Sequence, residues 1–312
     1  MSTFDDVGNP VPPLSAKLLK EMSKKGMKPE SPVLVRIFKQ ESELEVWKQD
    51  KTGRYALLKV YPMCRWSGKL GPKTRSGDRQ APEGFYHVSA GMLNPKSQYY
   101  LSFNLGYPNR LESALGYTGE ALMVHGACSS SGCYAMTDQG VGEIYAIVHR
   151  ALAGGQRSFQ VQAYPFRMSA ENMARHGNDP NFSFWKTLKE GYDYFQLTRL
   201  QPKVSACGRR YVFNAEFDGG EPRDPLAECP AQIGQTDSQL TARLQAETQK
   251  IEALLSSEST VGATAYVDGG MHPSFRALLE RSGPEKLAAK ISRTKYPISR
   301  PDAALADPYK GR

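Results

Sequence analysis

The chain has 312 residues, of which 40% are apolar, and its 40 Lys and Arg outnumber 32 Asp and Glu, for a formal net charge of +8. This length and composition exclude a disordered chain, and no run approaches the roughly 18 apolar residues of a membrane span. The charge alone suggests nucleic acid, but no binding motif accompanies it, so we expect no nucleic-acid partner. A wall polymer with free carboxylates, an anionic membrane surface or a solvated basic face fits equally well.

The first third of the chain predicts a short helix followed by an antiparallel sheet. After an extended lead rich in proline, Ser15 caps a basic amphipathic helix that ends near Lys25. From Pro32 the apolar period changes to two, and turns separate predicted strands over 33–38, 43–47 and 55–61. Such a meander is typical of the start of a β-sandwich or barrel.

Strands and helices alternate in the middle of the chain, after a Gly- and Pro-rich stretch that predicts a structured loop over 66–84. A helix is predicted over 141–152, where apolar residues recur at helical spacing. A pair of helices is also predicted, the first starting at Ser169 and the second over 182–195. We expect this pair to form a lid over the reactive residues 123–138 described below. The predicted strands of this region are 85–88, 99–105, 120–124 and 158–167.

The last hundred residues differ in character. Residues 214–230 are acidic and rich in Gly and Pro, which predicts a linker, and 239–256 carries one apolar stripe, which predicts an amphipathic helix. A turn at 269–274, a short helix over 275–281 and a basic end follow. The predicted organisation is a lead over 1–30, a central domain over 31–213 with the lid at 168–200, and a partly helical C-terminal extension over 214–312.

The chemistry concentrates in residues 123–138, M-V-H-G-A-C-S-S-S-G-C-Y-A-M-T-D. Three Ser and two Gly disfavour a continuous helix, but a strand end followed by a turn can bring His125 and Cys133 to one point. A thiol reacts as thiolate and needs a base, for which His125 is the nearest candidate. Gly132 permits a tight turn that leaves two amides free for an oxyanion. The alternative is a glycine-rich turn with a buried cysteine and a core histidine.

The five cysteines contain no C-x-x-C pair, and Cys128-x4-Cys133 with one His is a poor zinc signature. We therefore expect no metal site, and the chemistry of a thiol with a histidine base needs no organic cofactor. An odd number suits one working thiol and up to two disulfides in an oxidising compartment. Cys64 with Cys207 is the pair that we expect, and Cys128 is a candidate oxidation partner that would switch Cys133 off.

The string H-G-x-C-x-S-x-G-C-Y-A-M-T-D resembles the active-site signature of the L,D-transpeptidase (YkuD) catalytic domain family, in the variant of its YafK-like murein branch. The resemblance implies Cys133 as nucleophile, His125 as its base, and the amides of Gly132 and Cys133 as oxyanion donors. Most members have S-H-G-C and an Arg shortly after the Cys. This chain has Ser131, which we count with the catalytic turn, and Ala135 at those positions.

Two further strings, G-P-K…G-D-R-x-x-P-E-G-x-Y and L-S-F-N-L-G-Y-P-N, also resemble this branch. The resemblance covers about residues 32–213 and implies a mainly β fold, a mixed β-sandwich or barrel with helical insertions. For turn residues such as Tyr107 and Asn109, local packing is an equal alternative to substrate binding, and His176 is a further candidate for the site. The substrate-binding candidates are Tyr107, Asn109, Arg167, Ser130 and Lys73.

The activity implied by the resemblance is acyl transfer on the stem peptides of peptidoglycan. Cys133 forms a thioester with loss of D-Ala and passes the acyl group to an amine, on another stem or at the N-terminus of an outer-membrane protein or lipoprotein. With water as acceptor, the same thioester gives a hydrolytic carboxypeptidase or amidase, which releases D-Ala or wall-attached protein. A non-catalytic wall-binding module and a secreted toxin remain alternatives.

The same resemblance implies a periplasmic or cell-envelope location. The N-terminal residues M-S-T-F-D-D contain neither a basic nor an apolar signal region, so we expect that the export signal is absent from this chain. A cytoplasmic protein is the alternative.

Overall fold

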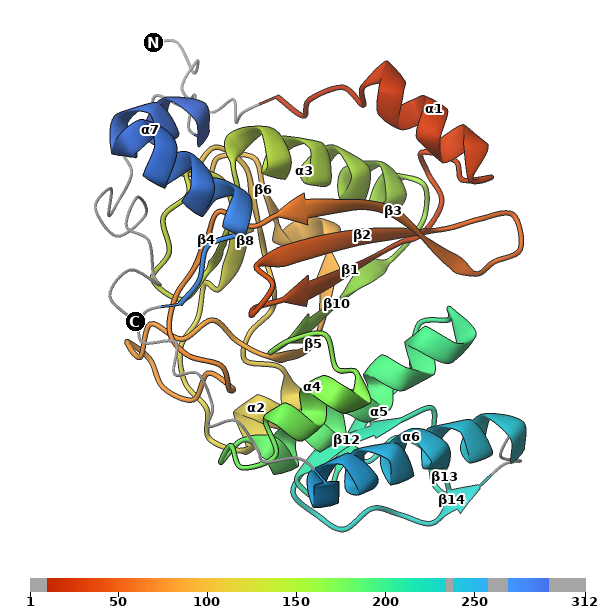
Figure 1. Ribbon diagram of the computed structural model, residues 1–312. Coiled ribbons are helices and arrows are strands. Elements are labelled where there is room, and N and C mark those ends of the chain that lie inside the picture. The colour runs from red at the N-terminus through yellow and green to blue at the C-terminus, as the bar shows by residue number, and fades with distance from the viewer. Residues whose placement is uncertain (1–9, 234–237, 258–268, 292–312) are drawn as a thin grey trace, which may run out of the picture.

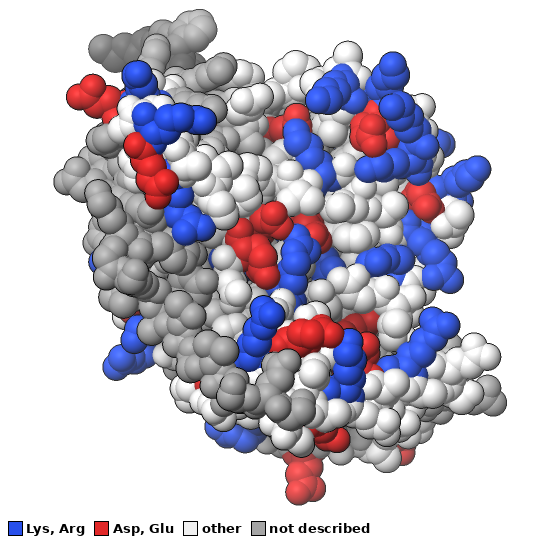
Figure 2. All heavy atoms as spheres, viewed as in Figure 1, with Lys and Arg blue, Asp and Glu red and all other residues white. Residues whose placement is uncertain are grey.

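The computed structural model describes residues 10–233, 238–257 and 269–291 (Figure 1). Within these residues the fold is mainly β, with two five-stranded sheets that share a core and with helices packed against them, which confirms the predicted fold class. No helix of the described part is long and apolar enough to cross a membrane. Figure 2 shows Lys and Arg spread among Asp and Glu on the face in view, with a denser basic group over the helix of residues 16–24.

The first sheet has the order β3-β2-β1-β10-β5. Its strands β1, β2 and β3 form the predicted meander, and β1 also pairs in parallel with β10, where Val35 lies opposite Val161. All six residues of β1 are buried because both faces of this strand are covered, which explains its nearly continuous apolar sequence. The bounds are β1 Val33–Phe38, β2 Glu43–Gln49, β3 Tyr55–Pro62, β5 Gly84–Ser89 and β10 Ser158–Tyr164.

The second sheet has the order β4-β9-β8-β7-β6 and short strands. The strands predicted over 99–105 and 120–124 are shortened, because Tyr100 (φ 74°) and Ala121 (φ 56°) adopt left-handed backbone conformations that interrupt an extended chain. The bounds are β4 Arg65–Trp66, β6 Leu93–Asn94, β7 Ser102–Asn104, β8 Met123–His125 and β9 Tyr134–Ala135.

Helices cover both faces of the first sheet. Helix α3 packs into the core between the sheets through Val141, Ile144 and Val148, while α4 and α5 cover the other face of the first sheet. Ser15 Oγ accepts the Leu18 N–H at 3.2 Å and caps α1, as predicted. The bounds are α1 Ala16–Lys24, α2 Arg110–Ala114, α3 Asp138–Ala153, α4 Ala170–Arg175, α5 Phe182–Thr198, α6 Ser238–Ser257 and α7 Pro273–Ile291, with a short 3-10 turn at Ala90–Met92.

The described residues after 203 pack onto the central sheets. Two small hairpins come first, and then α6 packs through Ile251 beside the residues of α4 and α5. Gly270 exchanges two backbone hydrogen bonds with Trp66 and thereby extends the edge of the second sheet next to β4. The predicted basic end from Arg293 lies outside the described residues. The hairpin strands are β11 Val204–Cys207, β12 Arg210–Phe213, β13 Glu216–Phe217 and β14 Gln232–Ile233.

The disulfides are Cys64–Cys128 and Cys207–Cys229, with Cα–Cα distances of 5.3 and 5.0 Å. The expected pairing of Cys64 with Cys207 is therefore wrong. The Cys64 N–H bonds to Ala135 O at 3.0 Å, which places Cys64 beside the second sheet, whereas Cys207 ends a strand of the β11–β12 hairpin. The second bond also anchors the predicted linker at Cys229. Cys128 is occupied by Cys64 and does not bond to Cys133.

Candidate active site

Two parallel strands, β8 and β9, place His125 and Cys133 on the same face of the second sheet. In their register, Val124 lies opposite Tyr134 and His125 opposite Ala135. Continuing this register places Cys133 opposite Met123, two residues before His125, and side chains two residues apart share a face. One strand across and two residues along separate the Cα atoms by about 8 Å, a gap that the two side chains can span.

The His125 ring is held in one orientation by a backbone carbonyl and an aromatic ring. Its Nδ1 lies 2.6 Å from Gly126 O, and because a carbonyl oxygen only accepts, Nδ1 carries the proton and Nε2 keeps a lone pair. The ring lies against Tyr99 at a centroid distance of 4.7 Å. Burial lowers the pKa of His125 to about 4. The imidazole is therefore neutral at pH 7 and able to accept a proton at Nε2.

Cys133 is the free thiol among the five cysteines and is partly exposed. Its Sγ accepts the Met123 N–H at 3.4 Å and lies 3.7 Å from Ala121 O. Burial raises the pKa of the Cys133 thiol, although the Met123 N–H and the positive charge of Lys73 act in the opposite direction. The resting pair is thus a neutral thiol and a neutral imidazole, so deprotonation must accompany attack by the sulfur.

The turn before Cys133 is built around Gly132, whose φ of 128° lies in the left-handed region that favours glycine. The Gly132 N–H donates to Ser130 Oγ at 3.3 Å, while the Cys133 N–H makes no hydrogen bond to any residue that the structure describes. Ser131 is exposed at the tip of the turn. Of the two predicted oxyanion donors, the Cys133 amide therefore has no partner in the described part of the chain, and the Gly132 amide already donates to Ser130 Oγ.

The polar groups of three predicted substrate-binding residues form hydrogen bonds with other groups of the protein. Ser130 is buried, and its Oγ donates to Cys133 O at 2.6 Å, so it shapes the turn. Tyr107 is also buried, and its hydroxyl donates to Lys73 O at 3.1 Å. Asn109 caps α2, and its Nδ2 donates to Tyr211 Oη at 2.7 Å. These polar groups are hydrogen-bonded within the protein, and their contact with a substrate stays a prediction.

Arg167 and His176 are likewise occupied elsewhere. The Arg167 guanidinium bonds to Glu45 Oε1 at 2.7 Å and to Glu43. These bonds outweigh burial and raise the pKa of Arg167, and the two carboxylates neutralise its charge. His176 stacks on Phe166 with Nε2 3.0 Å from Gln40 Oε1. Binding of an anionic substrate by Arg167 therefore gains no support from these contacts and stays a prediction, and His176 has packing contacts.

Lys73 is the predicted substrate ligand whose positive charge lowers the pKa of the Cys133 thiol, against the effect of burial. Its ammonium bonds to Asp78 at 2.5 Å and to Arg75 O at 2.8 Å, so it is buried in the loop before β5. The same loop flanks the turn of Cys133, because a Cβ on Gly132 would lie 3.6 Å from Gln80 O. The structure thus gives Lys73 an electrostatic influence on the thiol, and binding of a substrate carboxylate stays a prediction.

The predicted lid, α4 and α5, packs as part of the core. Trp185, Leu188 and Tyr192 lie in one cluster with Phe38 of the first sheet. The Trp185 Nε1 also donates to Glu83 Oε2 at 2.9 Å. These contacts give no support to a lid over Cys133, which stays a prediction.

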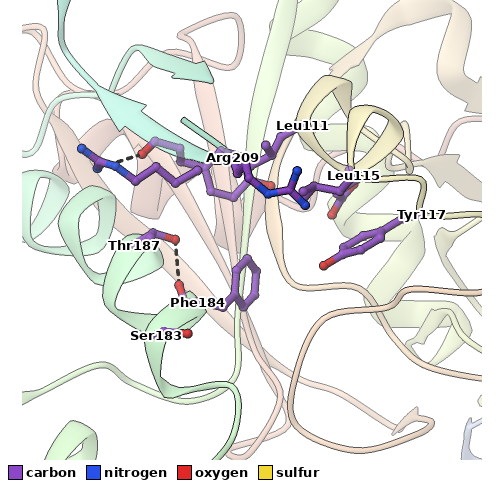
Figure 3. A pocket seen from close by; sticks show the side chains of 10 residues that line it. Leu111, Leu115, Tyr117, Ser183, Phe184, Thr187 and Arg209 are labelled. Carbon is purple, nitrogen blue, oxygen red and sulfur yellow. Dashed lines mark hydrogen bonds between the residues drawn. The ribbon is translucent and has the colours of Figure 1, made fainter. Parts of the chain in front are cut away.

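A hollow of about 260 Å³ lies between α2, α5 and β12 (Figure 3). The rings of Tyr117 and Phe184 border it together with the side chain of Arg209, which makes no ion pair with a described residue. Three distant segments form this hollow, so it has no signal in the sequence. Its apolar rings, and the Arg209 cation that has no ion pair among the described residues, fit a ligand with both an apolar part and a carboxylate, while the buried Glu112 also lies in the lining.

The sequence interpretation also missed three features next to His125 and Cys133: the Tyr99 ring, the Cys64–Cys128 bond and Asp138. Asp138 accepts the Ala127 N–H at 2.8 Å. The only signal for Asp138 was its position as the last residue of the signature string. Tyr99 and the disulfide had no local signal.

Comparison with known proteins places these residues in a family context. Residues 32–158 match the model of the family described as YkuD, L,D-transpeptidase catalytic domain. A protein named "Putative L,D-transpeptidase YafK" from Escherichia coli K12 is 51% identical over 183 residues, which are 58% of this chain and 74% of that protein. The protein of the same name from Escherichia coli O157:H7 matches equally.

Two solved structures show weaker likeness. The helical cell shape determining protein Pgp2 from Campylobacter jejuni matches with a TM-score of 0.35 and 19% identity, over 60% of this chain and 80% of that one. Bd1075 from Bdellovibrio bacteriovorus matches with a TM-score of 0.32 and 14% identity, over 56% and 76%.

Proposed function

Because the chain belongs to the L,D-transpeptidase (YkuD) family, in its YafK-like branch, we propose that it is a cysteine-dependent acyltransferase acting on the stem peptides of peptidoglycan. The observation that carries the proposal is the shared face of β8 and β9. By the strand register, the partly exposed free thiol of Cys133 shares this face with the Nδ1-protonated imidazole of His125, one strand across and two residues along. The site of action is the periplasm or cell envelope, where this substrate is found.

The first half-reaction acylates the thiol. His125 Nε2 takes the thiol proton as Cys133 Sγ attacks the carbonyl carbon after the third residue of a tetrapeptide stem, and a C–S bond forms. The Cys133 N–H donates to the oxyanion, with the Gly132 N–H able to join it if it turns from Ser130. The C–N bond then breaks, His125 returns the proton to the leaving nitrogen, and D-Ala departs from the thioester.

The second half-reaction depends on the acceptor. An amine from another stem, or the N-terminus of an outer-membrane protein or lipoprotein, attacks the thioester, forms an amide and returns the proton to sulfur. With water as acceptor, the product is a free carboxylate, which corresponds to a carboxypeptidase or to release of wall-attached protein. We rank transfer to an amine first and hydrolysis second.

We place the far end of the stem peptide in the hollow beside Tyr117. The chain from Tyr117 to Ala121, whose carbonyl lies 3.7 Å from Cys133 Sγ, spans at most about 14 Å. An extended peptide of four residues is about 13 Å long, so one stem can contact both places. A stem carboxylate would then meet the Arg209 guanidinium, with its aliphatic part between the rings of Tyr117 and Phe184.

Intact-protein mass spectrometry tests the acylation. The wild-type protein, incubated with a purified tetrapeptide muropeptide or with a carbapenem, is expected to gain the mass of the acyl group. Cys133→Ala should gain nothing, and His125→Gln should react slowly. Product masses separate the outcomes: a joined dimer indicates transfer, and loss of D-Ala with gain of water indicates hydrolysis. A folded wild-type protein that binds the muropeptide without any adduct would instead be a wall-binding module.

Two arginine substitutions test whether the stem peptide binds in the hollow. Arg209→Gln is expected to raise KM for the muropeptide several-fold with little change in kcat. Arg210 is the neighbouring arginine, but its Nη1 lies 3.7 Å from Glu190 Oε1, so Arg210→Gln should leave KM unchanged. Equal effects of the two substitutions would contradict the placement of the stem.

A further inference from the structure

One peptide unit connects His125 to Asp138. The carbonyl of Gly126 accepts the His125 Nδ1–H at 2.6 Å, and the N–H of Ala127 donates to Asp138 Oδ1 at 2.8 Å. Gly126 C=O and Ala127 N–H belong to the same planar amide group. The imidazole and the carboxylate are therefore the two ends of a chain of two hydrogen bonds.

The surroundings leave this peptide unit little freedom. A Cβ on Gly126 would lie 2.5 Å from Asp138 Oδ1 and 2.7 Å from Tyr99 O, so only glycine allows such close approach. Ala127 follows with a φ of 61°, in the left-handed region. Asp138 is buried, and as the first residue of α3 it places its carboxylate at the positive end of that helix. The carboxylate is thus fixed by a 16-residue helix.

Linked hydrogen bonds polarise one another, more so in a buried site. The Asp138 carboxylate, as an anionic acceptor of the Ala127 N–H, polarises the peptide group. This polarisation makes Gly126 O a stronger acceptor for Nδ1–H. This favours the tautomer with a lone pair on Nε2 and stabilises the imidazolium that forms when His125 takes a proton. An aspartate bonded directly to a histidine does the same in a Ser-His-Asp triad.

We propose that Asp138 is a positioning residue, which orients the base His125 and selects its Nδ1–H tautomer through the Gly126–Ala127 peptide unit. The inference rests on the proposed function, since it assumes that His125 is the base. Its structural claim about the tautomer can nevertheless be measured without turnover. A purely structural aspartate, one that only stabilises the start of α3, would leave the tautomer unchanged.

Nitrogen-15 NMR of the histidine side chains in the full chain provides the test. The chain has five histidines, and the signals of His125 are those absent from His125→Gln. The wild-type protein should show a protonated Nδ1 and an unprotonated Nε2. Asp138→Ala removes the acceptor and should give a mixture of tautomers. Asp138→Asn keeps a neutral acceptor for the Ala127 N–H and should retain the Nδ1–H form.

Acylation rates supply the second readout. Asp138→Ala is expected to slow thioester formation at least about tenfold, because the group that orients the imidazole and stabilises its protonated form is lost. Asp138→Asn should lie between wild type and Asp138→Ala. The control is Glu171→Gln, which removes a first-turn acid from α4 that pairs with Lys250 outside the site. This control should change neither the tautomer nor the rate.

A folded Asp138→Ala protein that keeps both the wild-type tautomer and the wild-type rate overturns the inference. If Asp138→Ala does not fold, Asp138→Asn decides, and a wild-type rate in that variant contradicts a role for the charge. If no variant, wild type included, forms a thioester, the proposed function fails. The tautomer comparison then still decides whether Asp138 controls the imidazole.

Discussion

Cys128 is disulfide-bonded to Cys64 and thereby attaches the turn between His125 and Cys133 to the start of β4. Both cysteines are fully buried in a cluster with Met271 and Phe275. The N–H of Cys128 also bonds to Met136 O at 3.3 Å. The bond therefore stabilises the turn that carries the proposed nucleophile and lies beneath residues of the C-terminal part.

Removing this disulfide should affect both stability and reactivity. Cys64→Ala with Cys128→Ala is expected to lower the free energy of unfolding by about 2–4 kcal/mol and to slow acylation, because the turn loses its covalent anchor. The matched control, Cys207→Ala with Cys229→Ala, removes the bond at the β11–β12 hairpin. Urea unfolding and intact mass measure both effects, and equal slowing of acylation by the control would contradict the prediction.

The pH dependence of alkylation should show a protonated resting thiol. Because burial raises the pKa of Cys133 above its ordinary value of 9.0, the rate of reaction with iodoacetamide should keep rising beyond pH 9. Mass spectrometry of the Cys133 adduct over pH 5–10 gives the profile, with glutathione as reference. A plateau between pH 6 and 8 would indicate a preformed thiolate–imidazolium pair instead.

Neutral His125 should make the protein less stable in acid. Its pKa is about 4 in the folded state and about 6.5 when exposed, so protons favour the unfolded state as pH falls from 6.5 to 4. The stability lost by this group over that window is at most about 3 kcal/mol.

The measurement is the difference between wild type and His125→Gln in urea unfolding at pH 7 and pH 4.5. The difference is needed because burial raises the pKa of Glu112 to about 7 and that of Asp193 to about 6. Protonation of these two carboxyls stabilises the folded protein as the pH falls, which is opposite in sign to the effect of His125. An equal loss in both proteins would count against the buried neutral imidazole.

The buried pair Lys39–Glu83 should be costly to break. Its Nζ–Oε1 distance is 2.9 Å with both side chains fully buried, and Glu83 also accepts the indole N–H of Trp185. Lys39→Met leaves an uncompensated buried carboxylate and is expected to cost about 3–5 kcal/mol in unfolding free energy. Lys203→Met, which breaks the half-exposed pair Lys203–Glu221, should cost less than about 1 kcal/mol. Similar losses in both variants would argue against this difference.

Features that depend on neighbouring residues were predictable. The alternation over 33–61 identified β1, β2 and β3, and helical periodicity identified α3, α5 and α6 within a few residues. Gly132 was expected at a tight turn and has a φ of 128°. A strand end followed by a turn predicts that His125 and Cys133 meet; the register places the two residues on one face of neighbouring strands, while their contact and their chemical roles remain predictions.

Features that depend on distant contacts were not predictable. The sequence predicts Arg167 as a substrate ligand and contains no sign of its ion-pair partners Glu43 and Glu45, which lie more than a hundred residues away. Tyr107 and Asn109 have the composition of an exposed turn, and only the packing of the loop at Lys73 and of β12 shows that their polar atoms are occupied.

The amino-acid sequence alone therefore determined which reactive groups this protein has and on which local elements they lie, because periodicity, glycine conformation and capping act over a few residues. The tertiary structure decided which cysteines are bonded, which charges are neutralised, and that Asp138 is joined to His125 through a single peptide unit. These pairings depend on strand register and on packing between separate elements. Both arise from the whole hydrophobic core, so no short stretch of sequence records them.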